Sequence, residues 1–332
     1  MKAIFIDKDP KTIYRVYAEK QMAALREIVD LDEKVYTSVD ELRAADVKDA
    51  EVILSTWGML PMTEEEIKET LPGAKVLFYA AGSVQGFARP FLNEGVRVFS
   101  AWQANGVSVA QYTLSQILLS AKGFFRVEQA MRNTGRQSGY EVASHYIGAY
   151  DIRVGLLGCG AIGTQVAQML KDTDCEVWVY DPFLPQERAD ELGVKLTDMD
   201  DIFAHCEIIS NHLANLPATV GIIKRHHLMG MMPYATFINT GRGPQLDEQD
   251  LYDALTTDPT RTALLDVMTN EHESDSKPLA KLPNCFITPH IAGTSGREVR
   301  RMADYMIACL KDYKAGLNPK YEVSMKMLET MA

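Results

Sequence analysis

Three side chains suited to acid–base chemistry and anion binding stand in the second half of the chain, each shortly after a short apolar segment. They are Arg242, Glu271 and His290. A guanidinium group binds a carboxylate through two hydrogen bonds and polarises a neighbouring carbonyl. An imidazole donates a proton to a carbonyl oxygen near neutral pH, and a carboxylate on its other nitrogen favours the protonated ring. Together the three residue types indicate reduction of a 2-oxo acid, provided that a cofactor supplies hydride.

Each of these residues also has an ordinary structural interpretation. Alone, Arg242 between Gly241 and Gly243 would be a solvated turn residue, Glu271 a surface acid and His290 a packed, hydrogen-bonded histidine. Their order along the chain favours the catalytic interpretation, because the carboxyl ends of parallel strands share one edge of a sheet. That edge is also where open α/β sheets bind their ligands.

A glycine-rich turn, residues 158–163, indicates where a cofactor binds. An apolar segment precedes it and a helical spacing of apolar residues follows it. Gly158 permits a sharp turn, Gly160 lets backbone N–H groups approach a pyrophosphate, and Gly163 lets the helix pack closely on the strand. The first turn of that helix presents unpaired N–H groups and a partial positive charge to the phosphates. The turn therefore predicts a dinucleotide site.

Asp181 ends the next strand-like segment, 176–180. It stands roughly 20 residues beyond the glycine turn, the spacing expected of an acid that binds the ribose. A carboxylate there accepts a hydrogen bond from a 2′-hydroxyl and repels a 2′-phosphate, and the first arginine nearby is Arg188. The pattern favours NAD over NADP.

The alternation of strands and helices indicates an α/β protein with two doubly wound parallel-sheet domains, Rossmann-like and flavodoxin-like, and a cleft between them. A helical tail, 296–313, follows the complete nucleotide unit. We therefore expect a discontinuous outer, substrate-binding domain, 1–104 plus 296–332, and an inserted NAD-binding domain, 105–295. Helices are expected over 11–29, 63–71, 107–125, 162–170 and 296–313, an irregular stretch over 126–150, and strands over 2–6, 51–55, 75–79, 96–99, 152–157, 176–180, 207–210, 235–239, 263–267 and 284–288.

Composition excludes several classes of protein. A net charge of −11 over 332 residues argues against a nucleic-acid surface, and 46% apolar residues without a long apolar run describe a globular chain with no membrane span. The N-terminus reads as a strand and not as a signal peptide. The five cysteines are widely spaced, as in a reducing cytoplasm, and His226 and His227 lie in a basic helical stretch, so no metal is expected.

These segments resemble the NAD-dependent D-2-hydroxyacid dehydrogenase family. The matching segments are 154–163, Tyr180-Asp181-Pro182, 238–243, 266–271 and 288–293. The resemblance implies a homodimer formed through residues 107–150 and catalysis by the three residues above. It also implies a list of binding residues. Those at the cofactor are Gly158, Gly160, Ala161, Ile162, Gly163, Asp181, His212, Leu213, Ala214, Thr219, Thr240, Gly241, Asp266 and Gly293, and those at the substrate are Trp57, Gly58, Ala81, Gly82 and Ser83.

The chain departs from the family pattern at four positions. His272 and Ala214 replace the usual prolines, Gly241 an alanine and Gln111 an acid. The substrate pair, a small 2-oxo acid and its D-2-hydroxy acid, is therefore left open, with glyoxylate, hydroxypyruvate and phosphoglycerate-like acids as candidates. Two alternatives remain: an NAD(H)-sensing binding protein of the corepressor type, and a dehydrogenase acting on formate or phosphite.

Overall fold

The computed structural model describes residues 1–329 and divides the chain into two compact units. Unit 1 contains Met1–Asn105 and the C-terminal segment that begins at Thr294, and unit 2 contains Gly106–Gly293. The side-chain Oδ1 of Asn105 accepts hydrogen bonds from the backbone N–H (3.1 Å) and the hydroxyl (3.0 Å) of Thr294. The two points at which the chain leaves and re-enters unit 1 are therefore joined.

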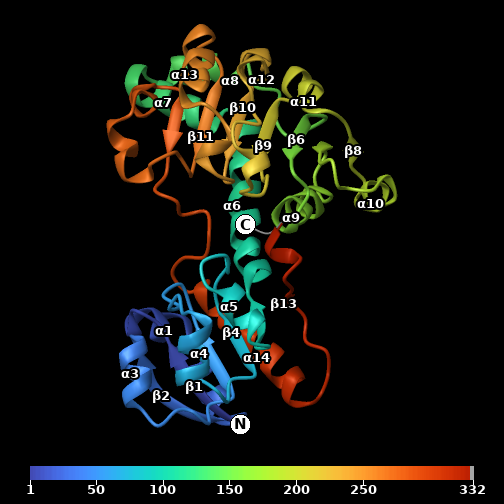
Figure 1. The fold of residues 1–332 in the computed structure, drawn as a ribbon. Helices are drawn as coiled ribbons and strands as arrows, with labels where there is room; N and C mark the ends of the chain where they lie inside the picture. Colours follow the sequence, from blue (N-terminus) through green and yellow to red (C-terminus); the bar gives the residue numbers. More distant parts are fainter. Residues whose placement is uncertain (330–332) are drawn as a thin grey trace. The chain divides into compact units, whose positions relative to one another are not determined.

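Unit 1 is built on a six-stranded sheet of order β13-β5-β4-β3-β1-β2, and Figure 1 shows its strands among the helices of this unit. The strands pair in parallel, except that β13 pairs antiparallel with β5. The strands are β1 (Lys2–Ile6), β2 (Asp30–Tyr36), β3 (Val52–Ser55), β4 (Val76–Tyr79), β5 (Arg97–Ser100) and β13 (Glu322–Val323), and the helices are α1 (Pro10–Val16), α2 (Glu19–Arg26), α3 (Val39–Ala44), α4 (Glu64–Thr70), α5 (Ala88–Asn93) and α14 (Val299–Lys314).

The C-terminal helix α14 completes the core of unit 1. Its buried residues Val299, Met302, Met306 and Leu310 recur at helical spacing and pack with residues of α1 and α2 on one face of the sheet. Residues of α3, α4 and α5 pack on the other face. Unit 1 thus needs chain from both sides of the inserted unit to bury its sheet.

Unit 2 is built on a seven-stranded parallel sheet of order β12-β11-β10-β9-β6-β7-β8. Apolar residues of α9 pack on one face, and those of α11 and α13 pack on the other. The doubly wound α/β prediction is confirmed. The strands are β6 (Arg153–Leu157), β7 (Glu176–Tyr180), β8 (Lys195–Leu196), β9 (Ile208–Asn211), β10 (Thr236–Asn239), β11 (Thr262–Leu265) and β12 (Cys285–Ile287), and the helices are α6 (Trp102–Ala121), which begins in unit 1, α7 (Phe124–Thr134), α8 (Arg136–Ala143), α9 (Ala161–Leu170), α10 (Gln186–Leu192), α11 (Met199–His205), α12 (Arg225–Gly230) and α13 (Glu248–Thr257).

The irregular stretch expected over 126–150 is wrong, because α7 and α8 occupy most of it. Its glycines do not prevent helices: Gly139 lies inside α8, and Gly135, with φ of 97°, lies at the end of α7, which begins after Gly123, with φ of 63°. These backbone conformations suit a residue without a Cβ. The helix expected over 107–125 also begins earlier, at Trp102, and ends at Ala121.

Two further expectations in unit 1 are corrected. The single helix expected over 11–29 is two helices, because the backbone is extended at Ala18 (ψ 175°), while Tyr17 packs its ring edge on Phe5 at 5.3 Å. Strand β2 was not expected at all, since four of its seven residues are charged. It lies at the edge of the sheet, where charged side chains are common.

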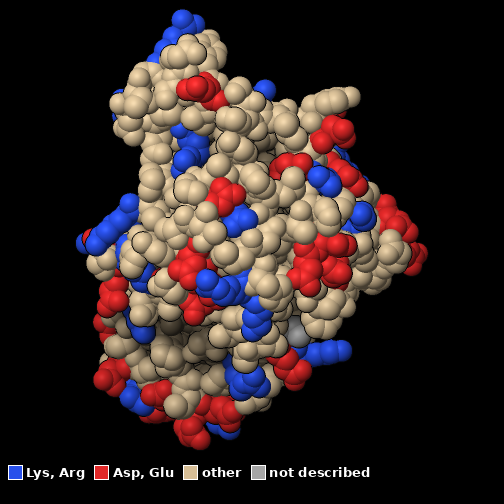
Figure 2. Space-filling view, turned by 90° about the horizontal axis from the view of Figure 1, so that it is seen from above, with Lys and Arg blue, Asp and Glu red and all other residues tan. Residues whose placement is uncertain are grey.

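The surface carries charges of both signs. On the face drawn in Figure 2, Lys and Arg side chains are intermixed with Asp and Glu side chains. Among residues 1–329, no helix combines the length and the apolar character needed to span a bilayer.

Candidate active site

The glycine-rich turn links β6 to α9 in unit 2. Gly158 has φ of 90°, and a Cβ there would stand 3.0 Å from the His212 carbonyl, while a Cβ on Gly163 would stand 2.1 Å from the Gly158 oxygen. Neither position accepts a side chain without rearrangement. A Cβ on Gly160 would meet nothing within 4 Å, so open space lies in front of this residue. Gly160 caps α9 without a side-chain hydrogen bond, which leaves the first turn of the helix able to bind an anion.

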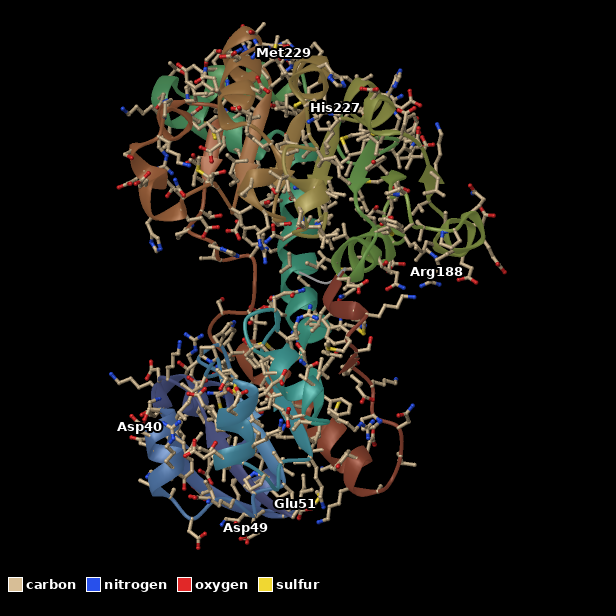
Figure 3. The ribbon with its side chains drawn as sticks, in the orientation of Figure 1. Asp40, Asp49, Glu51, Arg188, His227 and Met229 are labelled. Atoms are coloured by element: carbon tan, nitrogen blue, oxygen red, sulfur yellow. The ribbon has the colours of Figure 1, made fainter. Side chains whose placement is uncertain are left out.

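Asp181 lies at the end of β7 against the glycine turn. Its Oδ2 accepts a hydrogen bond from the Cys159 N–H (2.7 Å), and its Oδ1 accepts one from the Phe183 N–H (2.9 Å). Each oxygen keeps a lone pair for another donor. Arg188 lies on α10 (Figure 3), and its guanidinium is bonded to Glu191 at 2.5 Å. The open space at Gly160 and this carboxylate fit a dinucleotide with a free ribose 2′-hydroxyl.

Glu271 and His290 are brought together at the carboxyl edge of the same sheet. The Nδ1 of His290 lies 2.9 Å from the Oε2 of Glu271, and both side chains are about half exposed. The 3₁₀ turn Glu271–Ser276 comes after β11, and His290 comes after the neighbouring strand β12. A bond to Nδ1 leaves Nε2 as the ring nitrogen available to a substrate.

A buried carboxylate organises the loop that carries His290. Asp266 is 2% exposed and accepts three hydrogen bonds: from the Thr288 hydroxyl (2.6 Å) and the backbone N–H groups of Ile291 (2.8 Å) and Ala292 (2.8 Å). His290 itself has φ of 55°, a conformation that non-glycine residues seldom adopt. The sequence analysis placed Asp266 among the cofactor residues, and the structure adds this contact with the His290 loop.

Arg242 lies at the carboxyl end of β10, next to β11 in the sheet. A buried amide network holds its backbone. The Gln245 Oε1 accepts hydrogen bonds from the Arg242 N–H (3.0 Å) and from Asn211 (2.7 Å), and Asn239 accepts one from the Gly241 N–H (3.0 Å). Sequence reasoning missed this network, although polar residues at the ends of two buried strands were a visible signal.

His212 and the loop after it complete this side of unit 2. The His212 ring is buried between the Ser210 and Thr240 hydroxyls, and burial lowers its pKa to about 4, so the ring is neutral. The Thr219 hydroxyl bonds to the carbonyls of Ala214 (2.7 Å) and Leu216 (2.9 Å) and closes the loop. These residues follow β9, the neighbour of β6. Of the remaining residues expected at the cofactor, Leu213 lies in this loop, Gly241 next to Arg242, and Gly293 at the end of unit 2.

The residues expected at the substrate lie in unit 1, after β3 and β4. Trp57 is 44% exposed, with the Arg15 guanidinium 5.3 Å from its ring centre. The Gly58 N–H already donates a hydrogen bond to the Asp7 carboxylate (3.2 Å), so it is not free to bind a substrate carboxylate. After β4, the Ser100 hydroxyl bonds to the carbonyls of Ala81 (3.0 Å) and Gly82 (2.6 Å), while Ser83 is exposed.

Asp7 is a second buried carboxylate that sequence reasoning missed. It follows β1, is fully buried, and accepts hydrogen bonds from the Thr56 hydroxyl (2.5 Å), the Thr56 N–H (3.2 Å) and the Gly58 N–H (3.2 Å). A Cβ on Gly58 would stand 1.9 Å from an Asp7 oxygen. The loop that carries Trp57 is therefore fixed to the end of β1.

Comparison with known proteins supports the NAD-site prediction. Residues 114–292 match the family model described as D-isomer specific 2-hydroxyacid dehydrogenase, NAD binding domain. Among curated relatives, a D-3-phosphoglycerate dehydrogenase of Archaeoglobus fulgidus is 32% identical over 64% of this chain and 40% of its own length. A glyoxylate reductase of Korarchaeum cryptofilum is 26% identical over 85% of both chains. This chain thus spans well under two thirds of the phosphoglycerate dehydrogenase that it matches.

A solved structure shares the fold. The apo form of D-mandelate dehydrogenase from Rhodotorula graminis superposes with a TM-score of 0.80 at 18% identity, covering 97% of each chain. The match to the NAD-binding domain covers more than half of the chain, and it includes the glycine turn, Asp181 and the Glu271–His290 pair. The chain therefore belongs to the D-isomer specific 2-hydroxyacid dehydrogenase family.

Proposed function

We propose that this protein is an NAD-dependent dehydrogenase that interconverts a small 2-oxo acid and its D-2-hydroxy acid. The observation that carries the proposal is the 2.9 Å contact between His290 and Glu271 at the strand ends of the NAD-binding domain. Arg242, at the end of a neighbouring strand, supplies a group for a carboxylate. The names of the relatives, D-3-phosphoglycerate dehydrogenase and glyoxylate reductase, support small acids of this kind as substrates.

Each of the three side chains has a distinct task in the proposed reaction. NAD(H), when bound, supplies or accepts the hydride. Arg242 pairs with the substrate carboxylate and polarises the adjacent carbonyl. His290 donates its Nε2 proton to the oxygen that becomes the hydroxyl, and it takes this proton back in the reverse direction. Glu271 accepts a hydrogen bond from the Nδ1–H group, which orients the ring and stabilises its charged form.

Residues of unit 2 would hold the cofactor. The first turn of α9 at Ala161 and Ile162 would bind the pyrophosphate, and Asp181 would accept hydrogen bonds from the ribose. In unit 1, Trp57, Gly82 and Ser83 would contact the substrate, because they lie in loops at the carboxyl ends of β3 and β4.

Replacement of the proposed acid tests the reaction directly. His290→Gln should lower kcat by at least about a hundredfold, because proton transfer by a positioned side chain is typically worth that much. The affinity for NADH, measured by fluorescence titration, should stay within about threefold. His205→Gln is the matched control, since His205 is also exposed and pairs with an acid, Asp201.

Substrate panels separate the proposal from its alternatives. NADH oxidation with glyoxylate, hydroxypyruvate, pyruvate and phosphohydroxypyruvate should identify an accepted 2-oxo acid. Tight NADH binding without turnover of any of them would instead support an NAD(H)-sensing protein. NAD reduction by formate or phosphite alone would support the inorganic or one-carbon alternative.

We also infer a cytoplasmic homodimer formed through residues 107–150. Large apolar side chains are exposed in this segment: Phe124 (46%), Met131 (50%), Tyr140 (60%) and Ile147 (65%). A second copy of the chain would cover them. The five unpaired cysteines suit a reducing compartment. Light scattering after gel filtration should give twice the chain mass, and Met131→Glu with Ile147→Lys should give the monomer.

A further inference from the structure

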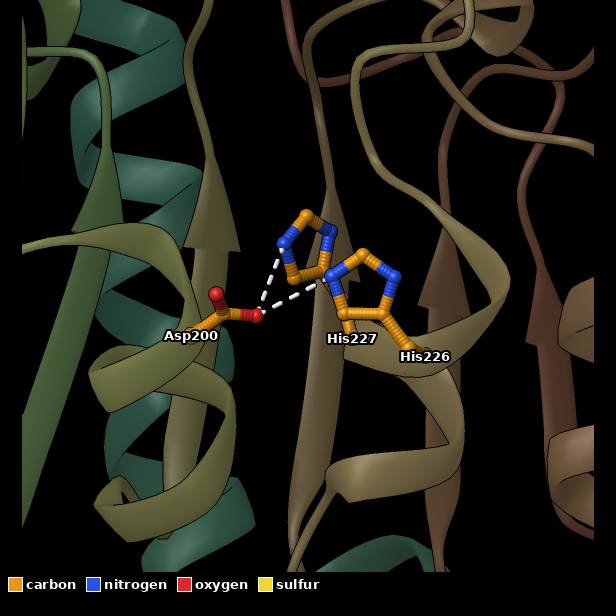
Figure 4. Close-up of side chains that lie close together, drawn as sticks. All are labelled: Asp200, His226 and His227. Atoms are coloured by element: carbon orange, nitrogen blue, oxygen red, sulfur yellow. Dashed lines mark ion pairs between the residues drawn. The ribbon is translucent and has the colours of Figure 1, made fainter.

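Two histidines and an aspartate meet on the surface of unit 2, on elements that play no part in the proposed reaction. Asp200 lies in the first turn of α11, and His226 and His227 lie in α12 (Figure 4). The Asp200 Oδ1 stands 3.1 Å from the His226 Nε2 and 3.2 Å from the His227 Nε2. All three ligand atoms lie within 4.8 Å of one another.

These separations suit a metal ion. Zinc binds imidazole nitrogen and carboxylate oxygen at about 2.0–2.2 Å in a tetrahedron, whose edge is then about 3.4 Å. The two separations from the aspartate oxygen to the histidine nitrogens fall close to that edge. Two imidazoles and one carboxylate favour Zn²⁺ over Mg²⁺ or Ca²⁺, which prefer oxygen ligands.

The site combines a fixed ligand with open access. The His227 side chain is 9% exposed and stacks on Phe203 with ring centres 5.3 Å apart. The side chains of His226 and Asp200 are 65% and 73% exposed, so an ion can enter from solvent and keep a water ligand.

One hydrogen bond must break before a metal ion can bind His227. The Lys224 N–H donates to the His227 Nδ1 at 2.9 Å, so the neutral ring carries its proton on Nε2, the nitrogen that lies 3.2 Å from the Asp200 Oδ1. A metal on Nε2 requires the proton to move to Nδ1, and the Lys224 N–H must then find another acceptor. Lys224 is exposed, so water can take that place. The His227 ring keeps one proton throughout. Metal binding replaces its hydrogen bond to the Lys224 N–H, at the start of α12, with a bond to the ion.

We propose that Asp200, His226 and His227 form a surface site for one Zn²⁺ ion that joins α11 to α12. The ion would complete its shell with water. Figure 3 places His227 on the NAD-binding unit, and none of the three ligands belongs to the proposed active site. The site therefore binds metal independently of the proposed dehydrogenase activity, and no zinc-like spacing in the sequence indicates it, because its ligands come from two separate helices.

Equilibrium dialysis of the chelator-treated full chain against Zn²⁺ tests the site. Asp200→Asn and His226→Ala should each weaken Zn²⁺ binding by at least about tenfold, since each removes one of three protein ligands. His205→Ala is the matched control and should bind as the wild type does, because His205 lies 3.8 Å from an Asp201 oxygen and belongs to no group of three candidate ligands among the residues that the structure describes. His290→Gln, measured in parallel, distinguishes any Zn²⁺ held by the Glu271–His290 pair from Zn²⁺ held at the Asp200 site. Turnover of the Asp200 and His226 variants, assayed without zinc, should equal that of the wild type.

A second readout examines the role of His227 itself. Long-range ¹H–¹⁵N NMR correlations of its ring should show the Nε2–H tautomer without metal and the Nδ1–H tautomer with Zn²⁺. Absence of bound Zn²⁺ at about 1 mM, or equal binding by the wild type and both variants, would overturn the site. An unchanged His227 tautomer in the Zn²⁺-bound protein would overturn the three-ligand arrangement.

Discussion

Each of the two units contains a buried aspartate that directly follows a strand and binds the loop after the adjacent strand. Asp7 directly follows β1 in unit 1, and Asp266 directly follows β11 in unit 2; both are buried. Each accepts one threonine hydroxyl and two backbone N–H groups from the loop after the adjacent strand. The difference is the side chain that the loop presents, which is Trp57 in unit 1 and His290 in unit 2.

The two buried carboxylates hold their loops in the same way, while the side chains on those loops differ in chemistry. In both units a buried carboxylate satisfies backbone donors that a strand-end loop would otherwise leave unpaired. The support does not determine the reaction. An aromatic ring on such a loop offers a binding surface, whereas an imidazole bonded to Glu271 offers a proton. Removing each carboxylate should therefore affect the two units in different ways.

Among the changes that test this comparison, the largest effect is expected at Asp266. Asp266→Asn keeps the shape, but its NH₂ group faces donors and leaves at least one of them unpaired, so kcat should fall at least tenfold and stability by about 3 kcal/mol. Kinetics and urea unfolding measure both. The affinity for D-hydroxy acid product should change less than kcat. An unchanged kcat would show that the carboxylate does not position His290.

Asp7→Asn should destabilise the protein to the same extent but should affect substrate binding instead of kcat. Stability should again fall by about 3 kcal/mol, because the Asp7 carboxylate accepts the same kinds of donor, together with the Asp9 N–H at 3.0 Å. The affinity for NADH should stay within about threefold, since NAD binding belongs to unit 2, while the KM for the 2-oxo acid should rise. A weakened NADH affinity with an unchanged KM would contradict the division of tasks between the units.

The buried His212 makes the stability of unit 2 depend on pH. Its pKa is lowered to about 4 in the folded state, against about 6.5 when unfolded, so the unfolded chain binds the extra proton between these values. Its contribution to stability is complete above pH 6.5 and is lost as the pH falls towards 4, with about 2 kcal/mol gone by pH 5. Urea unfolding at several pH values checks this. His212→Gln should show a shallower slope from pH 6.5 to 5, and an equal slope would assign the dependence to other groups.

The smallest effect is expected at Asp181. Asp181→Ser removes the charge that repels a 2′-phosphate, so the preference for NAD over NADP should narrow by about tenfold, or about 1.4 kcal/mol. The ratio of kcat/KM with the two cofactors measures this. Arg188→Ala serves as the comparison, since Arg188 is bonded to Glu191. The same ratio in Asp181→Ser and in the wild type would show that this acid does not read the ribose.

The sequence predicted those features that depend on local order. The strand–turn–helix unit at Gly158 and the placement of Glu271 and His290 at one sheet edge follow from residues close in the chain and from the rule for parallel sheets. The helical tail was expected to belong to the outer domain, and α14 lies in unit 1. Strand β2 was not, because an edge strand rich in charge lacks the apolar pattern of a buried one.

The parts that were missed depend on distant contacts. Asp7 and the amides around Gln245 were not named at all, and Asp266 was named only for the cofactor and not for its contact with the His290 loop. No local spacing marks the support given by the two acids, since an acid after a strand is equally common at a solvated turn. The same holds for His226 and His227, whose aspartate lies on another helix.

The hydrogen bonds between Asn105 and Thr294 bear on the order in which the chain assembles. The core of unit 1 needs α14, which is synthesised after the whole of unit 2. An unfolded insert would make closure entropically expensive, whereas a folded one presents its two ends side by side. We expect the inserted unit to fold first and to act as the template that lets the outer unit close.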